Sequence, residues 1–79
     1  MNVRERLAAY SHDSAWSGWM RYMLGKGTCN DDGSWTMPAW AVERWQRQMN
    51  TAYDLLSEAE KESDRAEADK ILDILGRSR

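Results

Sequence analysis

The residues that could carry out chemistry in this 79-residue chain are few and lie apart. His12 is the only histidine and Cys29 the only cysteine, so the sequence offers neither a disulfide within the chain nor a zinc-ligand pattern. The serines near His12 have no nucleophile-elbow motif, and there is no Gly-rich phosphate loop. Residues 30–33 lack the alternating ligands and terminal Glu of a calcium loop. We therefore expect no catalysis, no metal and no cofactor.

Aromatic side chains are the more promising candidates for ligand contact, because the chain has five tryptophans and five methionines but no phenylalanine. Trp16 and Trp19 recur at helical spacing, and an aromatic face that stacks on a nucleobase contributes about 1–3 kcal/mol per base. The alternative is a core stripe, which we favour for Trp19 and leave open for Trp16. Trp35 and Trp40 flank the central loop and are expected at a rim or a partner contact.

The second candidate cluster is polar and lies in the last third of the chain. Lys61 or Arg65 is suited to meet a phosphate, and Asp64 lies beside them. The competing interpretations are structural: ordinary ion pairs along an exposed helix face, or side chains that brace the connection at Tyr53. We favour the structural interpretations slightly.

Charge and hydropathy exclude several classes of protein. The formal net charge is −2, and between Glu58 and Asp69 six acids face only two bases. Without a basic stripe, nucleic-acid binding is not expected. Residue runs apolar enough for a membrane span or a signal peptide are absent from the sequence, so we expect a soluble, cytoplasmic protein.

The elements that must position these residues follow from periodicity and capping signals. Helices are predicted over residues 3–24, 38–50 and 57–75, with a possible break into two helices at the polar residues 11–14. Asn2 is a suitable N-cap, and Ser57 with Glu60 forms a capping box. The Asp32–Gly33 dipeptide predicts a turn between the first two long helices.

The predicted fold class is all-α, with one domain over residues 1–79. Three to four helices would surround one Trp/Met-rich core, and a Gly-rich loop or minimal β-hairpin would separate the first and second long helices. The residues expected in that core are Trp16, Met20, Met23, Val42, Trp45, Met49, Ile71, Leu72 and Leu75. The tail at residues 77–79 is expected to fray.

The segment from Tyr53 to Arg65 resembles the end of the ryanodine-receptor repeat (RyR) domain, which reads approximately P-Y-x-x-L-x-x-x-E-K-x-x-D-R. The matching positions, in register and without a gap, are Tyr53, Leu56, Glu60, Lys61, Asp64 and Arg65. Ala52 replaces the family's proline. The family's H-x-x-W is represented by His12 and Trp16, which are four apart rather than three, and its G-W-x-Y-G turn is not evident.

The whole chain is also similar to small phage and prophage proteins with W-S-x-W-M-x-Y and E-R-W-x-R-Q-M segments, here residues 16–22 and 43–49. The RyR resemblance implies a helical module that holds an adenine nucleotide against aromatic side chains. Together the resemblances imply a non-catalytic phage-type sponge for a nucleotide-derived immune signal of the host cell. The ligand-binding residues they imply are His12, Trp16, Trp19, Tyr53, Lys61, Asp64 and Arg65.

A protein-interaction module is the alternative function, namely a phage inhibitor or adaptor that presents Trp35, Trp40 and the acidic helix to a host protein. A homo-oligomer is compatible with either function. Because fold-level analogy does not establish function, both remain predictions at this point.

Overall fold

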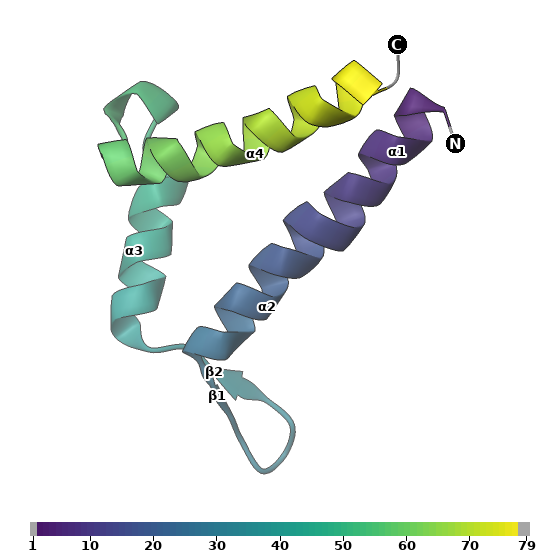
Figure 1. Ribbon diagram of the computed structural model, residues 1–79. Helices are drawn as coiled ribbons and strands as arrows, with labels where there is room; N and C mark the ends of the chain where they lie inside the picture. The colour runs from purple at the N-terminus through teal and green to yellow at the C-terminus, as the bar shows by residue number, and fades with distance from the viewer. Residues whose placement is uncertain (1, 78–79) are drawn as a thin grey trace.

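A computed structural model describes residues 2–77 as three helical rods that form the sides of a flat triangle, with a short hairpin at one corner (Figure 1). The predominantly helical architecture agrees with the predicted fold class. The elements in order are α1 (Val3–Tyr10), the π-helix η1 (Ser11–Trp16), α2 (Ser17–Lys26), β1 (Thr28–Cys29), β2 (Trp35–Thr36), α3 (Ala39–Met49), the 3-10 helix η2 (Tyr53–Leu55) and α4 (Glu58–Arg77).

The first rod consists of α1, η1 and α2 joined without interruption (Figure 1). Asn2 caps its start as predicted, because its side-chain oxygen accepts a hydrogen bond from the Glu5 backbone N–H at 2.8 Å. The polar residues 11–14 do not divide the rod into two helices. They widen it into a π-helical stretch, which allows the backbone to continue in the same direction.

The hairpin turns at Asp32–Gly33, where Gly33 adopts a φ of 86° that favours glycine. The strands pair antiparallel, and the Asn30 backbone N–H donates to the Ser34 carbonyl at 2.8 Å. Trp35 fixes this hairpin to the first rod, because its indole N–H donates to the Leu24 carbonyl at 2.8 Å. The same Leu24 carbonyl, near the end of α2, also accepts a hydrogen bond from the Gly27 backbone N–H at 3.2 Å.

The capping box that opens α4 is confirmed. The Glu60 backbone N–H donates to the Ser57 hydroxyl at 3.2 Å, and the Ser57 backbone N–H donates to the Glu60 carboxylate at 3.2 Å. The predicted end of this helix at Leu75 is wrong, because α4 continues through Gly76 to Arg77. The rest of the predicted fraying tail, residues 78–79, lies outside the described residues.

The predicted Trp/Met core is not formed within the single chain. Among the described residues only Ala41 is buried, because the rods meet near their ends and lie in a layer 16 Å thick between Cα extremes. Met49 is 76% exposed, Leu72 62% and Trp16 56%. The burial prediction is therefore wrong for its nine residues, none of which is buried: Trp16, Met20, Met23, Val42, Trp45, Met49, Ile71, Leu72 and Leu75.

Candidate functional site

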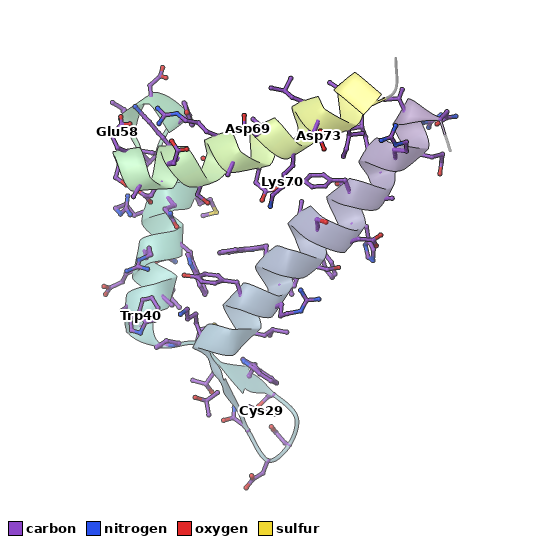
Figure 2. The ribbon with its side chains drawn as sticks, in the orientation of Figure 1. Cys29, Trp40, Glu58, Asp69, Lys70 and Asp73 are labelled. Atoms are coloured by element: carbon purple, nitrogen blue, oxygen red, sulfur yellow. The ribbon has the colours of Figure 1, made fainter. Side chains whose placement is uncertain are left out.

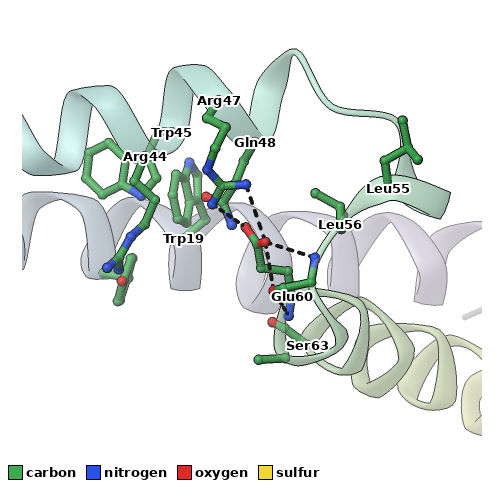
Figure 3. A pocket seen from close by; sticks show the side chains of 12 residues that line it. Trp19, Arg44, Trp45, Arg47, Gln48, Leu55, Leu56, Glu60 and Ser63 are labelled. Atoms are coloured by element: carbon green, nitrogen blue, oxygen red, sulfur yellow. Dashed lines mark hydrogen bonds and ion pairs between the residues drawn. The ribbon is translucent and has the colours of Figure 1, made fainter.

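A groove of about 950 Å³ opens where α2, α3 and the start of α4 face one another (Figure 3). A second hollow of about 610 Å³ continues it, and the two share most of their lining. We call the combined surface the central groove. Its shared lining residues are Trp19, Trp45, Gln48, Leu56, Ala59, Glu60 and Ser63. Arg44, Arg47 and Tyr22 line only the first hollow, whereas Met49 and Asp64 line only the second.

One wall of the central groove is an aromatic cluster that joins α2 to α3. The ring of Trp19 lies edge-on to Trp45, with centroids 5.3 Å apart and an interplanar angle of 75°. Trp19 also stacks on Tyr22 at 5.5 Å, and the Lys26 ammonium lies 5.2 Å from the Tyr22 ring centroid. Each such aromatic pair contributes roughly 0.5–1.5 kcal/mol beyond its buried area. Because Trp19 remains 45% exposed, the preference for it as a core residue is corrected to a half-exposed groove wall.

The opposite wall is polar and joins α3 to α4. An Arg47 guanidinium nitrogen lies 3.0 Å from one carboxylate oxygen of Glu60 (Figure 3). The other carboxylate oxygen accepts a hydrogen bond from the Ser57 hydroxyl at 2.8 Å. The hydrogen bond from Arg47, followed by those from Ser57, lowers the pKa of Glu60 to about 2. The Glu60 carboxylate is therefore ionised, and the Arg47 guanidinium balances its charge. This wall presents an ion pair rather than a proton donor.

Arg44 lies at the rim of the groove with its guanidinium 5.0 Å from the Trp40 ring centroid. This cation–π contact holds a positive charge beside the aromatic wall. The groove thus combines aromatic faces, an amide, hydroxyls, guanidinium groups and the carboxylates of Glu60 and Asp64. Such a surface can stack on flat groups, cover apolar side chains and donate hydrogen bonds to acceptors.

Two of the residues implied by the resemblance lie away from this groove. The rings of His12 and Trp16 stack on each other on η1, with centroids 5.6 Å apart and an interplanar angle of 12°. They line a separate shallow hollow of about 410 Å³ together with Ala8 and Ser11. The structure therefore does not place Trp16 opposite the polar residues of α4.

Three further residues implied by the resemblance, Tyr53, Lys61 and Arg65, do not line the central groove. They lie together at the start of α4 and at the connection that precedes it. The Lys61 ammonium lies 5.7 Å from the Tyr53 ring centroid and 3.7 Å from a Glu58 carboxylate oxygen. Arg65 pairs with Glu58 and Glu62, at 3.2 Å in each case. These contacts raise the pKa of Arg65, led by the hydrogen bonds to Glu62 and Glu58. The ion pairs match the structural interpretation of an exposed helix face, and the contact of Lys61 with Tyr53 ties that face to the Tyr53 connection.

Of the seven residues implied by the resemblance, the structure brings only Trp19 and Asp64 to the same groove. Sequence reasoning did not assign Trp45, Arg47 or Glu60 to the site. Glu60 was recognised as a capping residue, but its partner Arg47 is 13 positions away on another helix. A local pattern carries no signal for that pairing, whereas the tryptophan density did point to an aromatic surface.

Within residues 2–77, no group of three or more His, Cys, Asp or Glu side chains is arranged to hold a metal ion. None of the helices in that range combines the length with the apolar run that a bilayer crossing requires. The central groove, with hollows of about 950 and 610 Å³, is the candidate functional site.

No protein-family model, curated protein or solved structure matches the chain. The RyR-like and phage-like features thus rest on the residues that carry them.

Proposed function

We propose that this chain is a non-catalytic protein-interaction module whose central groove is covered by another polypeptide. The observation that carries the proposal is the amount of surface left open. The chain exposes 6239 Å², whereas a compact monomer of its mass of 9.2 kDa exposes roughly 4,900 Å². The excess of about 1,300 Å² exceeds the roughly 800 Å² that one partner contributes to a standard protein interface.

The chemistry of that surface supports a protein partner. Large hydrophobic side chains are exposed on every helical rod, among them Trp19, Met49 and Leu72. Contiguous apolar surface is costly to leave in water, and it marks interaction sites in folded proteins. Tryptophan and arginine are also the residues most enriched among those that dominate binding energy, and the groove contains both in Trp45 and Arg47.

Site-specific photo-crosslinking in the producing cell tests the proposal. A photoreactive amino acid at Met49, inside the groove, is expected to give covalent adducts with a polypeptide of defined mass. The same amino acid at Asp31, in the exposed hairpin turn, is the control and is expected to give none. If neither position forms an adduct while the chain retains its helical circular dichroism, the proposal fails.

A nucleotide or nucleotide-derived signal is the second candidate occupant, in the manner of the sponge that the RyR-like residues imply. The observation that favours it is the presence of Trp19 and Trp45 beside the guanidinium group of Arg44 along one groove. Aromatic faces stack on bases, and guanidinium groups bind phosphate in bidentate fashion. In this proposal the ligand contacts are Trp19 and the groove residues rather than Trp16.

Titration with adenine nucleotides and cyclic nucleotide signals tests this second candidate, followed by tryptophan fluorescence and calorimetry. A Trp45→Leu variant is expected to lose the response, whereas Trp16→Leu, which alters only the separate hollow, is expected to keep it. The absence of binding across a broad panel at millimolar concentration rejects the nucleotide and leaves the polypeptide.

A further inference from the structure

We infer that the polypeptide covering the central groove is a second copy of this chain, with α4 of each copy lying across the groove of the other. This inference rests on the proposed function, because it requires the groove to be a polypeptide-binding surface. It adds the identity of the partner and the element that it contributes.

The exposed surface area of the chain matches what a homodimer buries. An excess of about 1,300 Å² on each of two chains amounts to about 2,600 Å² of total surface, which lies within the roughly 2,000–5,000 Å² that obligate homodimers bury. The chain is also a single layer of helices, only 16 Å thick between Cα extremes. Stable domains pack at least two layers around a core, and a second copy supplies the missing layer.

The radius of gyration of the chain is that of a larger body. The radius of gyration is 15.8 Å, whereas a compact chain of this length has about 12 Å. The same scaling gives about 15 Å for a compact body of twice the length. The radius of gyration of one copy therefore already matches that of a compact two-chain domain.

An apolar stripe on α4 matches the apolar part of the groove. Ile71, Leu72 and Leu75 are spaced for one helix face, and all three are exposed. In the groove, Met49 is 76% exposed and adapts readily to an apolar partner surface. Seating the stripe of one copy against Met49 of the other covers these exposed apolar side chains in both copies.

The charges of α4 and of the first rod are opposite in sign. The α4 helix, Glu58–Arg77, carries seven acids against four bases, including Asp69 and Asp73 along its length (Figure 2). The rod from Val3 to Lys26 carries four bases against two acids. When α4 lies across the groove of the other copy, its acidic surface approaches the basic rod. Two-fold symmetry then repeats the favourable approach on the other side.

Molar mass in solution provides the first measurement. Size-exclusion chromatography with light scattering, over micromolar to millimolar protein, is expected to give about twice the 9.2 kDa of one chain. Met49→Glu and Leu72→Lys each place a charge in the contact and are expected to raise the dimer Kd at least about 30-fold. Val42→Glu is the matched control, because Val42 is exposed on α3 but does not line the groove. It is expected to leave the mass unchanged.

Mixing the Met49→Glu and Leu72→Lys variants gives the decisive result. In a mixed dimer, one contact pairs the new glutamate with the new lysine, and the other contact is wild type. The mixture is therefore expected to regain the dimer mass that neither variant shows alone. A misfolded variant does not regain it, so recovery also demonstrates that both variants fold.

Three results overturn the inference. A single-chain mass for the wild type at all concentrations excludes the second copy. The proposed function then stands if the Met49 crosslinker captures a different polypeptide, and falls if it captures none. A dimer unaffected by Met49→Glu and Leu72→Lys excludes the groove as the contact. Monomers that persist in the mixture exclude the pairing of α4 with the groove.

Discussion

Replacing Ser57 by Ala removes the cap of α4 and one of the contacts that hold Glu60 at the groove. The hydroxyl of Ser57 accepts a hydrogen bond from the Glu60 backbone N–H and donates one to the Glu60 carboxylate, at 3.2 and 2.8 Å. The change leaves the ion pair between Glu60 and Arg47 available. Its cost therefore measures the cap rather than the contact between α3 and α4.

The expected cost follows from capping energetics. Replacing a serine cap by alanine destabilises a helix by about 1 kcal/mol, within a range of about 0.5–2 kcal/mol. For 79 residues, an unfolding entropy of about 2.1 cal/mol/K per residue gives about 170 cal/mol/K near the melting temperature. The free-energy change divided by this entropy predicts a fall in Tm of about 6 °C.

Thermal melting followed by far-UV circular dichroism is the assay, at one fixed protein concentration because self-association makes Tm concentration-dependent. Ser63→Ala is the matched control, since it makes the same chemical change inside α4 where no cap is lost. Alanine has the better helix propensity, so Ser63→Ala is expected to hold or raise Tm. If the two variants melt within about 1 °C of each other, the capping box does not stabilise α4 and the reasoning is refuted.

Three further perturbations have defined outcomes. The folded-state pKa of Glu60, about 2, lies below its ordinary value of 4.5. The stability that Glu60 contributes is therefore present above pH 4.5 and is lost as the pH falls through 2. Urea midpoints are expected to drop further on acidification in the wild type than in Glu60→Gln, and equal drops would contradict the pKa assignment. Gly27→Ala places a Cβ atom 2.6 Å from an indole carbon of Trp35 and is expected to lower Tm, whereas Gly25→Ala meets no atom within 4 Å and is expected to raise it; the reverse order would show that the hairpin does not press on Gly27. Trp35→Phe loses the indole hydrogen bond to the end of α2 and is expected to destabilise by about 0.5–1.5 kcal/mol, with faster amide exchange in the hairpin as the readout and unchanged exchange as the contrary result.

Local signals in the sequence were sufficient for the helix starts. Asn2 and Ser57 cap α1 and α4 because the donors they satisfy lie within three residues along the chain. The turn at Gly33 was equally local, since its positive φ is a property of one residue. The end of α4 was less well defined, because glycine permits a helix to stop without forcing it to do so.

The candidate site required the tertiary arrangement. The RyR-like pattern placed Trp16 beside Lys61 and Arg65, yet Trp16 stacks on His12 while Lys61 lies over Tyr53. Helical spacing identifies which residues share a face, but it does not fix which faces meet. That choice depends on the angles at which the rods join. These angles are set by the aromatic contact between α2 and α3, the ion pair between α3 and α4 at Arg47, and the contact of α1 with α4, where the Tyr10 hydroxyl donates to the Glu67 carboxylate.

The sequence by itself determined where the helical segments lie, the caps at Asn2 and Ser57, and the turn, because each depends on hydrogen bonds between near neighbours and on the conformational preferences of single residues. It also determined that many tryptophans and methionines must find apolar surroundings. Only the tertiary structure decided that the chain does not provide those surroundings alone, since Ala41 is the one buried residue among those described. Burial depends on how whole rods pack, and an amphipathic stripe looks the same in sequence whether its partner is another helix of the chain or a surface outside it.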